Sequence, residues 1–236
     1  MSLYLCVLDF EATCWKDVVK DSQEIIEFPS VLYRLDPVYE EVASVAPPYA
    51  DDADDPILDA DPQDEEHTEY VLTRYNPTFI SEFSKYVRPT LNPQLSEFCT
   101  ELTGITQETV DAADTFETVY NQHHQWLLSL VPYDVTIAFV TVGNWDIQTM
   151  LPKEISNKKL RLYRMYRQFI NIKTEFDYFY GQKSGSMVNM LNKLGIPLEG
   201  KHHSGIDDTR NTAKILLRLL ADGHIAFQIQ TLMIHK

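Results

Sequence analysis

Cysteine is scarce in this chain of 236 residues, and the three present, Cys6, Cys14 and Cys99, form no Cys-x-x-Cys pair. An odd number of scattered thiols argues against a disulfide framework and favours a reducing, intracellular setting, in the cytoplasm, the nucleus or, if a leader was removed, an organelle. No apolar run approaches the ~18 residues of a membrane span, and no basic-then-apolar leader precedes the first apolar segment. We therefore expect a protein that does not associate with membranes.

Lysine and arginine are missing altogether from residues 36–69. This segment holds 13 of the 35 acidic residues: Asp36, Glu40, Glu41, Asp51, Asp52, Asp54, Asp55, Asp59, Asp61, Asp64, Glu65, Glu66 and Glu69. Its Pro- and Asp-rich composition is typical of a loop or a hairpin extension, so we treat residues 36–75 as an insertion in a single domain spanning residues 1–236. So many acids repel a phosphate backbone. Docking of a basic protein partner, control over which RNA may enter, and a solvated loop without a task are alternative interpretations.

Outside this segment the charge is nearly balanced, although the net charge of the whole chain is −15. The net charge alone argues against a nucleic-acid partner. Residues 153–173, however, carry seven bases against Glu154 alone: Lys153, Lys158, Lys159, Arg161, Arg164, Arg167 and Lys173. We expect a path for nucleic acid along this basic segment.

Apolar runs of strand length alternate with segments of helical periodicity. We expect strands at residues 3–8, 24–35, 70–75, 82–87, 135–142 and 169–172, and helices at 95–102, 114–130, 186–194 and 206–221. The basic segment that follows Asp146 is also expected to be helical. The pattern predicts the α/β class, with helices flanking a central sheet. The sheet should be mixed, mostly parallel, because the first strands are joined too closely for crossover connections.

The first apolar run ends in two acidic residues, Asp9 and Glu11. Side chains two residues apart in an extended chain point to the same side, so both carboxylates converge at the carboxyl end of a buried strand. Open α/β sheets tend to place ligands there. Two carboxylates without a counter-ion repel each other, and the arrangement asks for a divalent cation. Taken alone, the pair is equally consistent with two solvated loop residues.

Two further acidic positions lie near expected helix starts. Asn144 is a candidate N-cap after the strand at 135–142, which puts Asp146 in the first turn of the next helix. Asp208 falls in the first turns of the last helix, with His203 on the preceding loop and Gly205 giving the backbone its freedom. A His-x4-Asp pair alone is more often a capping or surface pair. Its value comes from the complete order D-x-E … D … H-x4-D.

This order resembles the DEDDh group of 3′→5′ exonucleases, most closely the Eri/Snipper-like family of histone-mRNA and small-interfering-RNA exoribonucleases. The motifs that carry the resemblance are LDFEATCW, EIIEFPSVL, YVRP, LSEFCTELTGITQETVDAADTF, GNWD, the INI of residues 170–172, and HSGIDDTRNTA. They extend over nearly the whole chain outside residues 36–75. The resemblance implies a ribonuclease-H-like fold and hydrolysis of RNA 3′ ends to nucleoside 5′-monophosphates.

The resemblance also implies a role for each member of the set. Four carboxylates, those of Asp9, Glu11, Asp146 and Asp208, would hold two Mg2+ ions, with Mn2+ as a substitute. His203 would accept the proton of the attacking water. Glu11 would in addition bind the terminal ribose.

A wider set of residues is implied to contact the terminal nucleotide: Phe10, Ala12, Thr103, Trp145 and His203. Core packing is the alternative for the rings of Phe10 and Trp145, and Gly104 beside Thr103 is equally explained as a helix stop. Beside the last motif, His202 and Asp207 are expected to be solvated or to support its residues from behind. Among the remaining histidines, His123 and His124 are expected on an exposed helix face without a special role.

The leading interpretation is a metal-dependent exoribonuclease that acts on single-stranded RNA 3′ ends or overhangs. A DNA exonuclease of the same fold is the nearest alternative, because the motifs do not read the sugar. A non-catalytic RNA- or protein-binding module is a third, and the five intact site residues count against it. One departure from the family pattern is Val142, where an acid is frequent; it changes a neighbour of Asp146 and not a proposed ligand.

Overall fold

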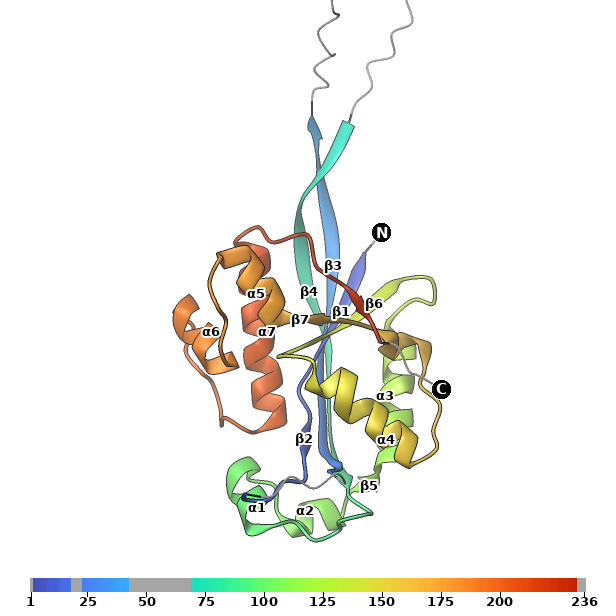
Figure 1. The fold of residues 1–236 in the computed structure, drawn as a ribbon. Helices are drawn as coiled ribbons and strands as arrows, with labels where there is room; N and C mark the ends of the chain where they lie inside the picture. The colour runs from blue at the N-terminus through green and yellow to red at the C-terminus, as the bar shows by residue number, and fades with distance from the viewer. Residues whose placement is uncertain (1, 18–22, 43–68, 233–236) are drawn as a thin grey trace, which may run out of the picture.

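A computed structural model describes residues 2–17, 23–42 and 69–232, and the chain there forms one twisted sheet between two layers of helices (Figure 1). The strands are β1 (Leu3–Leu8), β2 (Glu11–Ala12), β3 (Ile25–Val42), β4 (Glu69–Arg88), β5 (Asp114–Thr115), β6 (Thr136–Thr141), β7 (Gln168–Asn171) and β8 (Gln230–Thr231). Their order is β5-β4-β3-β1-β6-β7-β8, with β2 paired to β3. Among these strands, β3 and β8 run opposite to the others, so the sheet is mixed with mostly parallel strands, as the sequence predicts.

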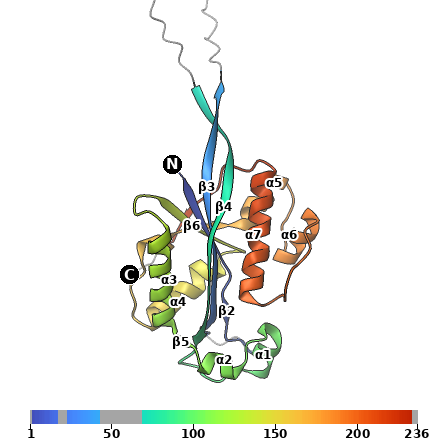
Figure 2. The same cartoon turned by 180° about the vertical axis from the view of Figure 1, so that it is seen from behind.

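The helices cover the two faces of the sheet unequally. They are α1 (Glu97–Thr103), α2 (Gln107–Asp111), α3 (Phe116–Leu130), the π-helix η1 (Trp145–Met150), α4 (Leu151–Asn157), the 3-10 turn η2 (Arg164–Arg167), α5 (Ile172–Tyr180), α6 (Met187–Leu194) and α7 (Gly205–Ala221). Figures 1 and 2 show α3 and α4 on one face, α5, α6 and α7 on the other, and α1 and α2 at one end. Within the described residues, no helix is both long and apolar enough to cross a membrane.

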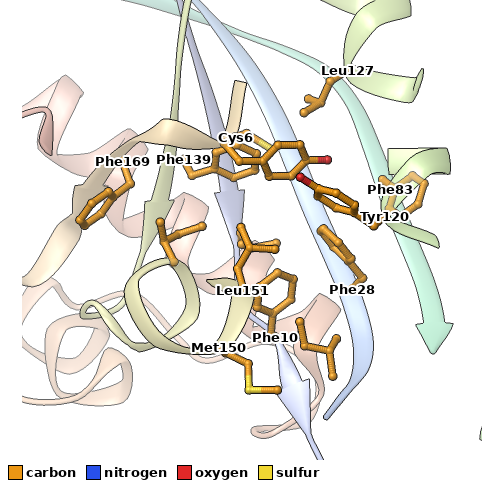
Figure 3. Close-up of a cluster of buried hydrophobic side chains, with 14 of the residues drawn as sticks. Cys6, Phe10, Phe28, Phe83, Tyr120, Leu127, Phe139, Met150, Leu151 and Phe169 are labelled. Atoms are coloured by element: carbon orange, nitrogen blue, oxygen red, sulfur yellow. The ribbon is translucent and has the colours of Figure 1, made fainter. Parts of the chain in front are cut away.

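Strand β1 lies at the centre of the core. Its alternate residues Cys6 and Leu8 pack under α3 and α4, while Leu5 and Val7 pack under α5 to α7, and all four are fully buried. Burial on both faces is what an unbroken apolar run predicts. Figure 3 shows the first of these clusters, in which several aromatic rings surround Cys6. The strand therefore presents its carboxyl end, and the Asp9 that follows, from a rigid support.

Helix α3 differs from its expected start and from its expected exposure. The helix was expected over 114–130 but begins at Phe116, because Asp114 belongs to β5 and pairs there with Val87 of β4; Thr115 precedes the helix without a capping side-chain bond. His123 is fully buried, so the expectation of an exposed position is wrong. Its ring nitrogens lie 2.7 Å from the Tyr166 hydroxyl and 2.9 Å from the Ser30 hydroxyl. Since both nitrogens have partners, the histidine is buried without an unpaired polar atom.

The basic segment is not the continuous helix that the sequence suggests. Helix α4 ends at Asn157, and the chain then passes through η2 into β7. Lys158 is held by an ion pair of 2.7 Å with Glu24, so it is not free to bind phosphate. Arg164 and Arg167 line a cavity beside the amino end of β6, whereas Asp146 follows the carboxyl end of that strand. The expected contacts with nucleic acid therefore depend on the remaining bases of the segment, Lys153, Lys159, Arg161 and Lys173.

The acidic insertion begins and ends as a β-ribbon. Strands β3 and β4 pair continuously from Glu27 opposite Tyr86 to Val42 opposite Glu69, so residues 70–75 and 82–87 belong to one strand and not to two. Strand β1 starts opposite Leu35, and Asp9 follows its other end. The described part of the insertion therefore extends away from Asp9, as a hairpin extension (Figure 1). Residues 43–68, which hold most of its acids, lie outside the described residues.

Candidate active site

Asp9 and Glu11 lie together where β1 ends. Glu11 opens β2 and pairs with Glu27 of β3, so the chain after β1 remains at the same edge of the sheet. Burial and several acidic neighbours raise the pKa of Asp9 well above its usual value; these neighbours are Asp146, Glu11, Asp208 and Glu27. The same two causes raise the pKa of Glu11 to about 9. Residues far apart in the sequence thus form one carboxylate cluster, which is unfavourable without cations.

Asp146 enters this cluster from η1. The Phe10 backbone N–H donates to Asp146 Oδ1 over 2.9 Å, which ties the start of η1 to the end of β1. Burial raises the pKa of Asp146 to about 6, although that hydrogen bond opposes the shift. Asn144 precedes the helix as expected, but its side chain makes no capping bond and the first turns are π rather than α. Such π segments are frequent at functional sites, because the wider turn redirects a side chain.

The turn before Asp146 is fixed by Asn171, which the sequence analysis did not single out. Gly143 has a φ of 92°, a conformation that favours glycine. The Asn171 carboxamide oxygen accepts hydrogen bonds from the Gly143 N–H at 3.0 Å and the Lys173 N–H at 3.1 Å. Asn171 therefore caps α5 and fixes the Gly143 turn that follows the neighbouring strand β6. It is the middle residue of the INI motif, and this was the feature of the sequence that could have pointed to it.

Asp208 lies in the first turns of α7, with His203 on the preceding loop, as predicted. The His203 backbone N–H donates to Asp208 Oδ2 over 2.9 Å, and the φ of 67° at His203 gives the loop its bend. His202 Nδ1 lies 3.0 Å from the same carboxylate oxygen, and the His202 and His203 rings stack 3.9 Å apart. Burial and His202 lower the pKa of His203. The expected base thus has a ring that carries no resolved bond to Asp208, while His202 supports that carboxylate.

Glu27 is an acidic residue of the site that the sequence analysis missed. Its side chain is buried, and its two oxygens accept hydrogen bonds from the N–H groups of Gly205 at 3.0 Å and Ile206 at 3.2 Å. These are the first two backbone amides of α7, so Glu27 of strand β3 caps the helix and thereby sets the position of Asp208. The signal was present as an acid inside the apolar run of residues 24–35.

Gly205 is required for space and not for backbone freedom. Its φ is not positive, which makes the expected reason wrong. A Cβ at this position would lie 3.0 Å from the Asp9 carbonyl oxygen, from Glu27 Oε2 and from Pro29 Cγ. Helix α7 can approach the end of β1 only because residue 205 has no side chain. This close approach brings Asp208 into the same cluster as Asp9.

We expect Glu27→Gln to weaken the site without unfolding the protein. A glutamine oxygen can accept a hydrogen bond from one of the two α7 N–H groups, but its NH2 group would face the other N–H, which is also a donor. Loss of such a supporting contact typically costs about 10–100-fold in metal affinity or activity. The metal concentration for half-maximal activity should therefore rise. Glu82→Gln is the matched control, because Glu82 also ties β4 to α7, through Arg210, but it is half-exposed. An unchanged metal response in Glu27→Gln would contradict this role.

The expected nucleotide contacts fare differently. The Phe10 ring is 5% exposed and packs edge-on against Phe28 with centroids 4.7 Å apart (Figure 3), so the expectation that it stacks on a base is wrong. The Thr103 hydroxyl is buried, donating to the Cys99 carbonyl and accepting from the Ile105 N–H, so its contact with a nucleotide stays a prediction. Ala12 is nearly buried in β2. The Trp145 indole is 39% exposed directly before Asp146, and its contact with a nucleotide stays a prediction.

The donor set of the cluster fits divalent cations. Mg2+ prefers hard oxygen ligands, and Asp9, Glu11, Asp146 and Asp208 offer only carboxylate oxygens. Among the described residues, the ligand atoms that all lie within 4.8 Å of one another are those of His202, His203 and Asp208, so an ion that tolerates imidazole could share Asp208. Bound cations would remove the mutual repulsion that raises the pKa values of the acids. The carboxylates can therefore hold divalent cations, and the neighbouring His203 can accept a proton.

The chain is similar in sequence and in fold to known nucleases. The family model described as Exonuclease (RNase_T) matches residues 71–216, which include Asp146, His203 and Asp208. "ERI1 exoribonuclease 2" of Xenopus laevis is 32% identical over 236 residues, covering 93% of this chain and 29% of the relative. "3'-5' exonuclease Snipper" of Drosophila melanogaster is 29% identical, with 93% and 70% covered.

A solved structure, the nuclease domain of 3'hExo, a DEDDh family member, bound to rAMP, superposes with a TM-score of 0.74 and 31% identity. The match covers 98% of this chain and 97% of that domain, so the fold expected from the resemblance is confirmed. The chain nevertheless spans less than a third of the length of the Xenopus relative. The similarity thus extends over the whole nuclease domain of 3'hExo but over only a part of the Xenopus relative.

Proposed function

The chain belongs to the exonuclease family, and from this membership we propose that it is a divalent-metal-dependent 3′→5′ exoribonuclease of single-stranded RNA 3′ ends or overhangs. The observation that carries the proposal is the carboxylate cluster of Asp9, Glu11, Asp146 and Asp208 at the end of β1, with His203 beside it. These residues follow β1, open β2 and lie in or next to η1 and α7, and acids with raised pKa values gathered in this way are typical of a catalytic site.

In the proposed reaction, water attacks the terminal phosphodiester, the 3′-oxygen leaves, and a nucleoside 5′-monophosphate is released. Asp9, Glu11, Asp146 and Asp208 would hold two Mg2+ ions, with Mn2+ as a substitute. When bound, the ions would neutralise the charge of the attacked phosphate and of the leaving oxygen. His203 accepts the proton of the attacking water at a ring nitrogen, which its lowered pKa keeps unprotonated at neutral pH.

The remaining contacts orient rather than react. The Phe10 N–H holds Asp146, the His203 N–H holds Asp208, and Glu27 holds the start of α7. Glu11 is proposed to bind the terminal ribose as well. Trp145 and Ala12 are proposed to border the terminal nucleotide.

RNA is preferred over DNA in this proposal because the Xenopus relative is named an exoribonuclease and the superposed nuclease domain is bound to rAMP, whereas Snipper is named an exonuclease without a substrate. The test is to incubate end-labelled single-stranded RNA and DNA of the same sequence with Mg2+ or with EDTA. Stepwise shortening of RNA from the 3′ end, with Mg2+ only, supports the proposal. Preferential shortening of DNA would replace the substrate class, and binding without cleavage of either strand would make the chain a non-catalytic module.

His203→Ala is expected to lower kcat by roughly 10²–10⁴-fold, the usual range for a general base. The rate of the wild type should fall on the acid side as His203 becomes protonated, and the variant should lose this limb of its pH profile. His202→Ala is the comparison, because its ring lies 3.0 Å from the Asp208 carboxylate and is proposed to support that carboxylate rather than to accept the proton. If His202→Ala removes the acid limb while His203→Ala keeps it, the two histidines exchange roles.

A further inference from the structure

The loop between α6 and α7 carries His203, the base of the proposed reaction, and contains no helix or strand (Figure 1). His203 has a φ of 67°, a backbone conformation that residues other than glycine rarely adopt. Such a conformation persists only where the surrounding structure holds it. The contacts of this loop with the rest of the chain therefore decide where the imidazole ring lies. We call residues 199–203 the histidine loop.

Helix α7 binds the histidine loop at every second residue. The backbone N–H of Glu199 donates to Asn211 Oδ1 over 3.1 Å, and that of Lys201 donates to Asp207 Oδ2 over 2.9 Å. The N–H of His203 makes the third such bond, to the proposed metal ligand of the same helix. Asp207, for which solvation or support was expected, is thus a supporting residue. Because all three acceptors are side chains of α7, the loop and the helix form one unit.

Asn211 makes the most complete of these attachments. Its oxygen accepts the Glu199 N–H, and its NH2 group donates to the Glu199 carbonyl over 2.8 Å. The same NH2 group donates to the Asp207 carbonyl over 2.9 Å. A carboxamide can bond in this way because it has both a donor and an acceptor, whereas a carboxylate has no donor and an apolar side chain has neither. Asn211 therefore pairs with Glu199 as a residue of a neighbouring strand would.

The place of Asn211 in α7 is unfavourable for the helix alone. The helix covers Gly205–Ala221, so Asn211 lies in its interior, and its side chain is fully buried. Asparagine is a weak helix former, and burial of its carboxamide costs free energy unless the polar atoms are hydrogen-bonded. The bonds to the histidine loop offset both costs. The reason for this residue is therefore its contact with the loop and not the formation of the helix.

Gly200 shows how closely the histidine loop fits against α7. Its φ is 75°, and a Cβ at this position would collide with the Asp207 carboxylate. The loop can approach the helix there only because residue 200 has no side chain. His203 follows in the same loop, so a displacement at Gly200 would move the imidazole ring as well.

We propose that Asn211 is a positioning residue for His203. It holds the backbone of Glu199 at the start of the histidine loop and thereby fixes the other end of the loop, which carries the imidazole. Helix α7 also supplies Asp208, so the proposed base and a proposed metal ligand share one support. The inference rests on the proposed function, since His203 acts as a base only in that reaction. Asn211 acts through His203 and not on the RNA.

The test is a double-mutant cycle on the hydrolysis of end-labelled single-stranded RNA by the full chain with Mg2+. Asn211→Ala should lower kcat by about 10- to 100-fold with KM unchanged, because misplacing a reacting group by about 1 Å costs up to about 10²-fold. In the His203→Ala background the same substitution should change kcat by no more than about twofold, because the group that it positions is gone. A residue with a merely structural role would cause the same loss in both backgrounds.

A second variant and a matched control accompany Asn211→Ala. Gly200→Ala lies on the exposed loop and outside the core, and it should lower kcat only where His203 is present. Thr212→Ala is the control, because Thr212 is the next residue of α7 and is also fully buried. Its hydroxyl oxygen has no hydrogen-bond partner among the residues that the structure describes. The kcat of the control should match that of wild type.

Hydrogen–deuterium exchange of the metal-free protein measures the same contact without the reaction. The amides of residues 199–203 should exchange at least about fivefold faster in Asn211→Ala than in wild type, because the bonds that protect the loop are lost. Thr212→Ala should exchange there at the wild-type rate. A thermal melt of each variant distinguishes loss of folding from loss of positioning.

Wild-type kcat in both Asn211→Ala and Gly200→Ala would overturn the proposal. Equal losses with and without His203 would overturn it too, since Asn211 would then act through another group. Unchanged exchange of the histidine loop in Asn211→Ala would show that the contact does not hold the loop, and this also counts against it. If wild type itself fails to shorten RNA with Mg2+, the proposed function is refuted, and the exchange measurement alone decides whether Asn211 holds the loop.

Discussion

Chelation with EDTA is expected to abolish hydrolysis of labelled RNA completely, and Mg2+ or Mn2+ to restore it. The reaction requires that the negative charge of the phosphate and of the leaving oxygen be neutralised, but the site itself consists of carboxylates. Without cations these carboxylates repel the phosphate of the substrate. The measurement is the rate of release of nucleoside 5′-monophosphate before chelation, after it, and after re-addition of each ion. Cleavage that persists after thorough chelation would contradict a metal-dependent mechanism.

The same chelation is expected to make stability depend on pH in a characteristic direction. Burial raises the pKa of Asp146 to about 6, and burial together with acidic neighbours raises that of Glu11 to about 9. A raised pKa stabilises the folded state fully below the pKa of the unfolded chain, and this contribution is lost as pH rises through the folded value. The metal-free protein should therefore melt at falling temperature from about pH 5 to pH 9. Mg2+ should raise the melting temperature far more at pH 8 than at pH 5.

Asp9→Asn is expected to lower turnover by at least about 10³-fold while the protein stays folded. Asp9 lies at the centre of the cluster, with four acids close enough to raise its pKa, so an amide there removes a ligand from the proposed metal site. Removing one charge also relieves repulsion. The metal-free variant should melt at the same temperature as wild type at pH 8, or at a higher one.

Asp134→Asn is the control for this variant, because Asp134 is an exposed acid beside the amino end of β6. Its turnover and its melting temperature should both match wild type. If metal-free Asp9→Asn instead melts much earlier than wild type, Asp9 is a structural residue. If it cleaves RNA at the normal rate, the assignment of the site is wrong.

The sequence by itself determined several local elements and identified four of the acids that the structure brings together, Asp9, Glu11, Asp146 and Asp208. An unbroken apolar run predicts a strand buried on both faces, and β1 is one. Ser96 and Gly104 bound helix α1 where its pattern ends, since a hydroxyl at the start and a left-handed residue at the end satisfy the free backbone groups. The spacing of Asp9 and Glu11 also follows from strand geometry alone. These features depend on interactions between near neighbours in the chain.

Only the tertiary structure decided how these elements meet. Glu27 and Asn171 hold α7 and the Gly143 turn through bonds to backbone amides from other elements, and no local pattern specifies such partners. The ring of Phe10 became core because Phe28 of β3 lies across from it. His123 was buried for a similar reason, since Ser30 and Tyr166 supply partners from β3 and η2. A residue's burial depends on what the rest of the chain places beside it, and periodicity within one segment does not contain that information.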